Sequence, residues 1–383
     1  MPVVHTFMMP EYFPRFTCKG GDCRNTCCRG WGISVSLDEY FRLLSMPCPA
    51  KIRRQLDGAF HPADAPSPER YAMITPKFDG DCPLHQENGW CGLQVNCGED
   101  ALPAICRRYP RNVRLRGGIY ECSCSNSCER TLELLFESKD PLTCIEKEFA
   151  FDIPEPEETL GAKEIALYAP LRTKIISLLN DRSKPLPVRL SQLGRLITAA
   201  MDHHENTGMT TPDLPQINYN TRATLPVQHE LLHTLEETSP ALAYEEPLVE
   251  CPLKLGAGER VTDESVQRYE QNAKRFNEIL PDNERYFEQM LTHHIFYEGF
   301  PFSDARMDMW HAYMALCGCY ALLRLTAVGA VQDKTPNALN DFIDLMSRVF
   351  RAVEHSRFDW NAAVTLNRLG WTGQREMDLL LTT

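Results

Sequence analysis

The stretch FTCKGGDCRNTCCRGWGI, residues 16–33, places four cysteines within eleven residues, and Cys27 and Cys28 are adjacent. The N-terminal segment MPVVHTFMMPEYFPRF lacks the basic start and apolar core of a secretory signal, so we expect a cytoplasmic protein. Reducing compartments rarely keep structural disulfides, and a dense cysteine cluster there is more typical of metal binding. The stretch therefore predicts a metal-binding module near the N-terminus.

Further cysteines follow this opening group along the first third of the chain. Of the sixteen cysteines, thirteen precede residue 145. Thiolates are soft ligands that suit zinc and iron–sulfur clusters, which usually take four of them. The spacing alone does not decide between zinc and an iron–sulfur cluster. It also does not decide whether the cysteines form one metal centre or two. The candidate metal ligands are Cys18, Cys23, Cys27, Cys28, Cys82, Cys91, Cys106, Cys122, Cys124 and Cys128.

Charge is distributed unevenly along the 383 residues. Residues 1–144 carry 17 basic and 17 acidic side chains, whereas the remaining 239 carry 23 and 35, which accounts for the net charge of −12. An acidic surface repels phosphate backbones, so we expect no nucleic-acid partner and find a cationic one more compatible. No apolar run approaches the roughly 20 residues that a membrane-spanning helix needs, so no membrane partner is expected.

The patterning predicts a mainly α protein with a cysteine-rich, loop-rich N-terminal metal-binding module followed by an α-helical domain. We expect the module at 1–144, a linker at 145–160 and the helical domain at 161–383, with an irregular, Pro-rich insertion at about 207–260. Ser36, three residues before Glu39, predicts a capping box in SLDEYFRLL. Apolar periodicity predicts helices at 160–180, 188–205, 227–237, 263–280, 282–298 and 305–329, and another after Thr335 and Pro336. In the apolar helix, Cys317 and Cys319 are expected to act as small hydrophobes.

Four blocks of sequence carry a family resemblance. They are FTCKGGDCRNTCCRGWGISVSLDEY, GDCPL with GWCGL, LPAICRRYPR, and CSCSNSCERTLELL, and they cover about residues 5–140 in that order. Together they resemble the bacterial flagellin lysine-N-methylases, a cysteine-rich group described as zinc- or iron-chelating. The helical remainder, including YEQNAKRFNEIL and HHIFYEGFPF, is similar in texture.

The resemblance implies methyl transfer from S-adenosylmethionine to surface lysines of flagellin, together with a [4Fe-4S] cluster, zinc being possible instead of iron. Arg107, Arg108 and Arg111 crowd beside Cys106, where they could bind a cofactor carboxylate, neutralise a thiolate-rich cluster or belong to a solvated basic strand. The lysine substrate must lose a proton, since its pKa is about 10.4. The sequence assigns no base: Tyr109, Asp38 and Glu121 lie near the cysteine motifs but are expected to be structural.

Two other functions compete with this interpretation. HELLH at residues 229–233 matches a zinc-peptidase pattern in which His229 and His233 bind zinc and Glu230 is the general base. A third ligand would have to come from a residue such as Glu245, Glu246 or Glu250. The second alternative is a non-enzymatic iron–sulfur or zinc sensor that uses the same cysteines. The adjacent pairs at 203–204 and 293–294 are expected to be surface or capping histidines.

Overall fold

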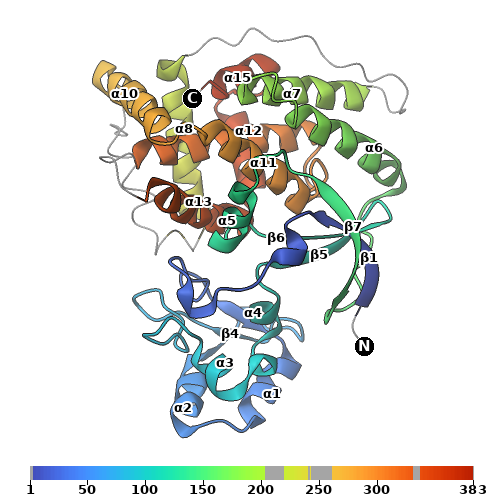
Figure 1. Cartoon of the computed structure of the whole chain (residues 1–383), viewed down its shortest axis with the longest axis vertical. Coiled ribbons are helices and arrows are strands. Elements are labelled where there is room, and N and C mark those ends of the chain that lie inside the picture. Colours follow the sequence, from blue (N-terminus) through green and yellow to red (C-terminus); the bar gives the residue numbers. More distant parts are fainter. Residues whose placement is uncertain (1–2, 203–219, 240–241, 243–260, 331–336, 383) are drawn as a thin grey trace.

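The computed structural model describes residues 3–202, 220–239, 242, 261–330 and 337–382. Its buried apolar side chains form two separate cores. The smaller core lies between Val35 and Leu102, whereas the larger one takes in the N-terminal strand and the helices. Figure 1 accordingly shows a small lobe beside a larger helical body.

The smaller lobe is built on a short antiparallel sheet in the order β2-β4-β3. Ser36 accepts from the Glu39 amide and Glu39 bonds back, so the predicted capping box is confirmed at the start of α1. The thinness of this core is typical of a region that needs additional cross-links. The elements of the lobe are β2 (Ile33–Val35), α1 (Leu37–Ser45), α2 (Ala50–Ala59), β3 (Phe60–Pro62), β4 (Ala72–Ile74), α3 (Gly92–Cys97) and α4 (Ala104–Arg108).

A four-stranded mixed sheet lies at the edge of the helical body, in the order β5-β6-β1-β7. Strand β1 runs parallel to β6, with Met8 opposite Glu121, and antiparallel to β7 along its whole length. Residues 145–151, expected in a linker, therefore belong to the edge strand β7. The strands are β1 (Val3–Pro10), β5 (Arg111–Arg116), β6 (Ile119–Cys124) and β7 (Cys144–Phe151).

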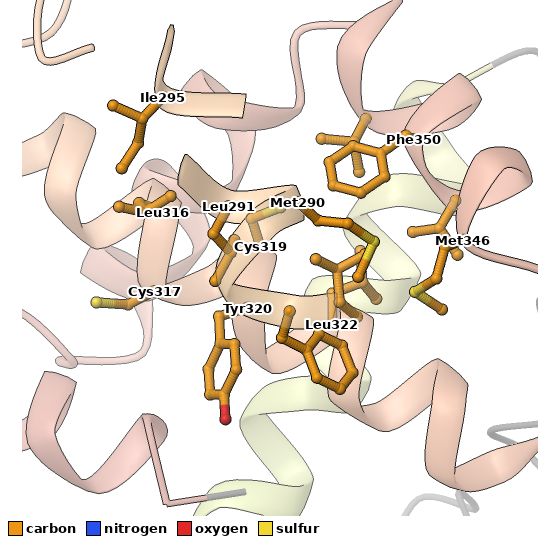
Figure 2. Close-up of a cluster of buried hydrophobic side chains, with 14 of the residues drawn as sticks. Met290, Leu291, Ile295, Leu316, Cys317, Cys319, Tyr320, Leu322, Met346 and Phe350 are labelled. Atoms are coloured by element: carbon orange, nitrogen blue, oxygen red, sulfur yellow. The ribbon is translucent and has the colours of Figure 1, made fainter. Parts of the chain in front are cut away.

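The helices of the body surround α12, whose eighteen residues from Ala312 to Gly329 are all buried. Figure 2 shows apolar side chains of α11, α12 and α13 interleaved around Cys319 and Met290. Cys317 and Cys319 are fully buried in this packing, as expected of small hydrophobes. The helices are α5 (Glu129–Glu137), α6 (Ala162–Leu179), α7 (Leu186–Asp202), α8 (Thr221–Thr238), α10 (Asp263–Ile279), α11 (Asn283–Glu298), α12 (Met309–Gly329), α13 (Ala338–Glu354), α14 (Phe358–Arg368) and α15 (Gln374–Leu380).

The mainly helical class is confirmed, and the predicted helices from residue 160 onward are present with shifts of up to six residues at their described ends, the largest at α8, which begins at Thr221 and not at residue 227. The statement about apolar runs was wrong in one respect. Helix α12 is long and apolar enough to cross a membrane by length and composition, but its apolar window is entirely buried inside the protein. Thr335, Pro336 and most of the Pro-rich insertion lie outside the described residues.

Candidate functional site

The cysteine-rich loop before β2 is held against α13 by one buried arginine. The Arg351 side chain is fully buried, and its guanidinium donates to the carbonyl oxygens of Thr26 and Arg29, at 3.0 Å each. The same side chain lies over the ring of Trp31, 5.1 Å from its centroid, as a cation–π contact. These contacts fix the backbone on both sides of the two adjacent cysteines.

Cys28, Cys82, Cys91 and Cys106 come together from three segments, and we call them the first thiol group. Every pair among them is close enough for the charge of one thiolate to raise the pKa of the other. The Cys82 amide donates to the Cys28 carbonyl at 2.8 Å, which joins the loop to the 82–91 turn. Burial raises the pKa of Cys91 at the start of α3, and the nearby amides of Gln94 and Leu93 partly offset this rise.

Cys28 is the most acidic thiol of the first thiol group. The hydrogen bond from the Cys27 thiol, with help from His85 and the Thr26 hydroxyl, lowers the pKa of Cys28 to about 6 although burial opposes it. Burial raises the pKa of Cys82 to about 12 and that of Cys106 well above its usual value. Cys28 is therefore the thiol that ionises first.

Cys18, Cys23 and Cys128 form a second thiol group, again with every pair in electrostatic contact. Cys128 is the N-cap residue of α5, where the amides of Arg130 and Thr131 offset part of the rise in its pKa that burial causes. Cys27 lies between the groups, because both Cys106 and Cys128 raise its pKa.

Two further cysteines of the predicted ligand set lie in the larger core. Cys124 is 0% exposed and is in electrostatic contact with Cys128, whereas Cys122 is 1% exposed and only burial raises its pKa. Cys122 therefore stands apart from both thiol groups, with Cys124 as its link to them.

The donor chemistry of these groups fits a thiolate-ligated centre, but the thiols are not arranged as a finished site. Among the residues that the structure describes, no three His, Cys, Asp or Glu side chains are placed so that they could hold one metal ion as they stand. The first thiol group supplies the four soft donors that zinc or an iron–sulfur cluster requires. Its members are electrostatic neighbours, but their sulfurs are not placed as one set of ligands.

A cavity of about 580 Å³ opens beside the thiol groups, where α4 and β5 meet β7, α11 and α13. All three arginines predicted to bind a cofactor line it. Arg107 lies 3.7 Å from Asp152, and Arg111 is stacked over Phe16. Its remaining polar and aromatic lining includes Glu99, Tyr109, Phe149, Phe151, Tyr297 and His355. The cavity thus combines cationic, aromatic and acidic groups.

A buried polar chain connects CSCSNSC, residues 122–128, to this cavity. Ser125 and Ser127 are 0% and 1% exposed, and their hydroxyl oxygens are 2.5 Å apart. Ser125 Oγ donates to the Glu354 carboxylate at 2.6 Å, and Ser127 Oγ lies 2.9 Å from His355 Nε2. Tyr109 reaches Ser127 at 2.9 Å, so two side chains of the cavity wall end on one buried serine.

The sequence analysis missed most residues of this buried polar chain. Tyr297, Glu354 and His355 belong to no recognisable motif, and the only signal for them was that polar residues interrupt apolar helices. The expectation that residues 293–294 are surface or capping histidines was wrong. His293 and His294 are buried, and they bond to Tyr12 and Asn126 and to Glu354 respectively. The pair at 203–204 lies outside the described residues.

Glu121 and Tyr109, two of the three candidate bases that sequence analysis set aside, both have side-chain partners. Glu121 is 1% exposed and pairs with Arg172 and Tyr168, away from the cavity lining. Tyr109 lines the cavity and bonds to Ser127. Asp38 is exposed in the first turn of α1.

The HELLH segment lies in α8, but its three polar side chains do not converge. Glu230 bonds to Arg368 at 2.8 Å, and His233, whose side chain is 60% exposed, lies beside acidic residues of its own helix. Burial lowers the pKa of His229 to about 4. The proposed third ligands, Glu245, Glu246 and Glu250, lie outside the described residues. Within the described ranges nothing completes a zinc site here.

The fold and the cavity define a class: a helical protein whose cysteine-rich lobe adjoins an arginine-lined pocket. Residues 172–365 match the family model described as the FliB lysine N-methylase C-terminal domain. That match spans half of the chain, and the chain therefore belongs to the FliB lysine N-methylase family.

Named relatives agree with this family. The lysine-N-methylases of Salmonella typhimurium and Salmonella choleraesuis are each 21% identical to the chain, over 94% of both sequences. The flagellar biosynthetic protein FliU of Salmonella muenchen is 24% identical over 37% of this chain and 83% of its own length. No solved structure matches.

Proposed function

We propose that this protein is a cytoplasmic protein-lysine N-methyltransferase that transfers methyl groups from S-adenosylmethionine to lysines of flagellin. Family membership carries the proposal, because the match to a lysine N-methylase domain spans half of the chain and similarity to the named methylases extends over 94% of it. The acidic balance of the chain supports a lysine-rich substrate, since opposite charge favours encounter.

The arginine-lined cavity supports the choice of cofactor. S-adenosylmethionine, when bound, supplies an electrophilic methyl group on a sulfonium sulfur. Arg107 and Arg111 would hold its carboxylate, because a guanidinium matches carboxylate geometry in a bidentate pair. Phe149 and Tyr297 provide aromatic walls and Glu99 an acceptor for hydroxyl groups. A cavity of about 580 Å³ falls in the range usual for cofactor sites.

The thiols support a metal centre as part of the same proposal. We assign the first thiol group, Cys28, Cys82, Cys91 and Cys106, as the ligands of a [4Fe-4S] cluster, with zinc as the other metal that four thiolates accept. When bound, the cluster would cross-link the opening loop, the 82–91 turn and α4. The arginines that follow Cys106 would then be held at the cavity wall.

The decisive experiment incubates anaerobically purified protein with flagellin and S-adenosylmethionine and follows intact mass. Transfer adds methyl groups to flagellin in single steps, and peptide mapping places them on lysines. Arg107→Ala and Arg111→Ala should weaken binding of S-adenosylhomocysteine, measured by calorimetry. Arg54→Ala, at an arginine of α2 that does not line the cavity, is the matched control. Absence of transfer by metal-replete protein would refute the enzyme and leave the sensor alternative.

A further inference from the structure

The protonation of His355 can be worked out from the buried chain that ends on it. Burial raises the pKa of Glu354, but the hydrogen bond from His294 and its neighbouring charges lower it below the usual value. The Glu354 carboxylate is therefore ionised and can only accept. Ser125, 2.6 Å from Glu354, must therefore donate its single hydroxyl proton to that carboxylate.

The donors of the remaining hydrogen bonds follow in order from Glu354 to His355. Because the Ser125 proton is committed, Ser127 must donate across the 2.5 Å contact to the Ser125 oxygen. Ser127 then has no proton left for the 2.9 Å contact with His355, so His355 Nε2 carries the hydrogen and donates it. Tyr109 donates to the second lone pair of the Ser127 oxygen at 2.9 Å. The neutral imidazole is left with its lone pair on Nδ1.

The groups around His355 favour this neutral form. His355 is exposed to solvent, but partial desolvation by its packing, with the charge of Arg351, lowers its pKa below the usual 6.5, while Glu354 opposes them. The ring stands against Trp31 at a centroid distance of 4.7 Å and lies 6.1 Å from the ring of Tyr109. Its titratable and charged neighbours are thus Glu354 and Arg351 on α13 and Tyr109 after α4. Near neutral pH, His355 is therefore an uncharged imidazole at the cavity wall, and its Nδ1 can accept a proton.

We propose that His355 accepts the proton of the substrate lysine, and that Ser127, Ser125 and Glu354 fix the imidazole tautomer that makes this possible. The inference rests on the proposed methyltransferase function and adds the base that the sequence could not assign. The target side chain of flagellin arrives as an ammonium group, which has no lone pair to attack a methyl carbon.

The step balances with the sulfonium donor as the only co-reactant. The Nζ–H bond of the lysine breaks, its electron pair stays on nitrogen, and the proton bonds to His355 Nδ1. The freed pair forms the new N–CH₃ bond while the S–CH₃ bond breaks and leaves its electron pair on sulfur. The products are methylated lysine, the neutral thioether and an imidazolium, which returns its proton to water.

The first test needs no turnover. In protein carrying ¹³C,¹⁵N-labelled histidine, the His355 resonance is identified by its loss in His355→Gln. We expect Nε2 protonated, Nδ1 unprotonated and a pKa below 6.5. Ser127→Ala should remove this tautomer preference, whereas Ser67→Ala, at a half-buried serine of the small lobe, should leave it unchanged. An Nδ1-protonated tautomer in the wild-type protein overturns the inference.

The second test separates the base from the proposed function. His355→Gln keeps a donor for Ser127 but has no proton-accepting ring, so methylation at pH 7.5 should fall by about 100-fold or more. The deficit should shrink roughly tenfold per pH unit toward pH ~10, as water deprotonates the lysine. Added imidazole should partly rescue His355→Ala, and binding of S-adenosylhomocysteine should be weakened far less in both variants than in Arg107→Ala. If both variants keep the wild-type pH profile of methylation, the inference about His355 is overturned and the proposed methyltransferase function is not. If the wild-type protein transfers no methyl group, both the inference and the proposed function are overturned.

Discussion

At the scale of single residues, Gly20 and Gly21 bring two cysteine motifs together. The indole of Trp90 lies on this pair so closely that a Cβ at either position would overlap the ring. Gly20 also has a φ of +58°, which favours glycine. Because Trp90 directly precedes Cys91 and Gly20 lies between Cys18 and Cys23, this contact couples the first thiol group to the second.

We therefore expect Gly21→Ala to destabilise the protein by about 1–3 kcal/mol through overpacking against Trp90. Urea unfolding followed by tryptophan fluorescence measures the change. The matched control is Gly58→Ala in α2, where nothing lies within 4 Å of the added methyl group. That control should be neutral or stabilising by about 0.5–1 kcal/mol, because alanine is the better helix former. Equal effects at the two sites would contradict the indole contact.

At the scale of elements, a buried carboxylate joins α11 to α7 and to the turn before it. Glu288 is 1% exposed, and Arg189 and Arg182 donate to it at 2.6–3.0 Å. Glu288→Ala removes the carboxylate that both guanidinium groups share and leaves the fully buried Arg189 with Glu284 at 3.3 Å, so we expect a loss of about 3–5 kcal/mol. Urea unfolding tests this. Asp57→Ala removes the exposed partner of Arg53 in α2 and should cost under about 1 kcal/mol.

Helices α11 and α13 are joined by a buried ion pair whose strength depends on pH. His294 Nδ1 lies 2.9 Å from Glu354, and although burial opposes it, this bond with nearby carboxylates raises the pKa of His294 to about 9. The folded-state pKa exceeds the unfolded value of about 6.5, so the contribution is complete below pH 6.5 and disappears as the pH rises through 9.

The stability advantage of the wild-type protein over His294→Gln should therefore be largest near pH 6 and nearly absent at pH 10. The shift corresponds to roughly 3 kcal/mol. Unfolding free energies at pH 6, 8 and 10 provide the measurement. His311→Gln, at an exposed histidine that bonds to Asp308 at the start of α12, is the control and should show a much smaller change. A pH-independent difference between wild type and His294→Gln would argue against the ion pair.

At the scale of the whole molecule, the division of the thiols into two groups predicts which cysteines hold metal. Cys82→Ser, Cys91→Ser and Cys106→Ser should each abolish the brown colour of anaerobically purified protein and its roughly four irons per chain. Cys144→Ser and Cys319→Ala should retain both, because Cys144 lies in strand β7 and Cys319 in the apolar core. If the wild-type protein is colourless and holds stoichiometric zinc, the same cysteines bind zinc instead of an iron–sulfur cluster.

The described helices were predictable because their apolar faces repeat locally along the chain. The capping box at Ser36 and the buried α12 follow from residues within one or two turns of each other. The mixed sheet was not, since β1 finds its partners more than a hundred residues away in β6 and β7. Sheet pairing of this kind depends on the whole chain, and the short strands carry little periodic signal.

The sequence by itself determined the helical class, the concentration of soft sulfur donors before residue 145 and the arginines beside Cys106. Each depends on residue type and local spacing. Only the tertiary structure decided which thiols are neighbours, that Arg107, Arg108 and Arg111 share a cavity with Tyr297 and His355, and that the histidines of α11 are buried. The physical reason is that burial, pKa and hydrogen-bond direction arise from contacts between segments that can be more than three hundred residues apart, and the packing of the two cores creates those contacts.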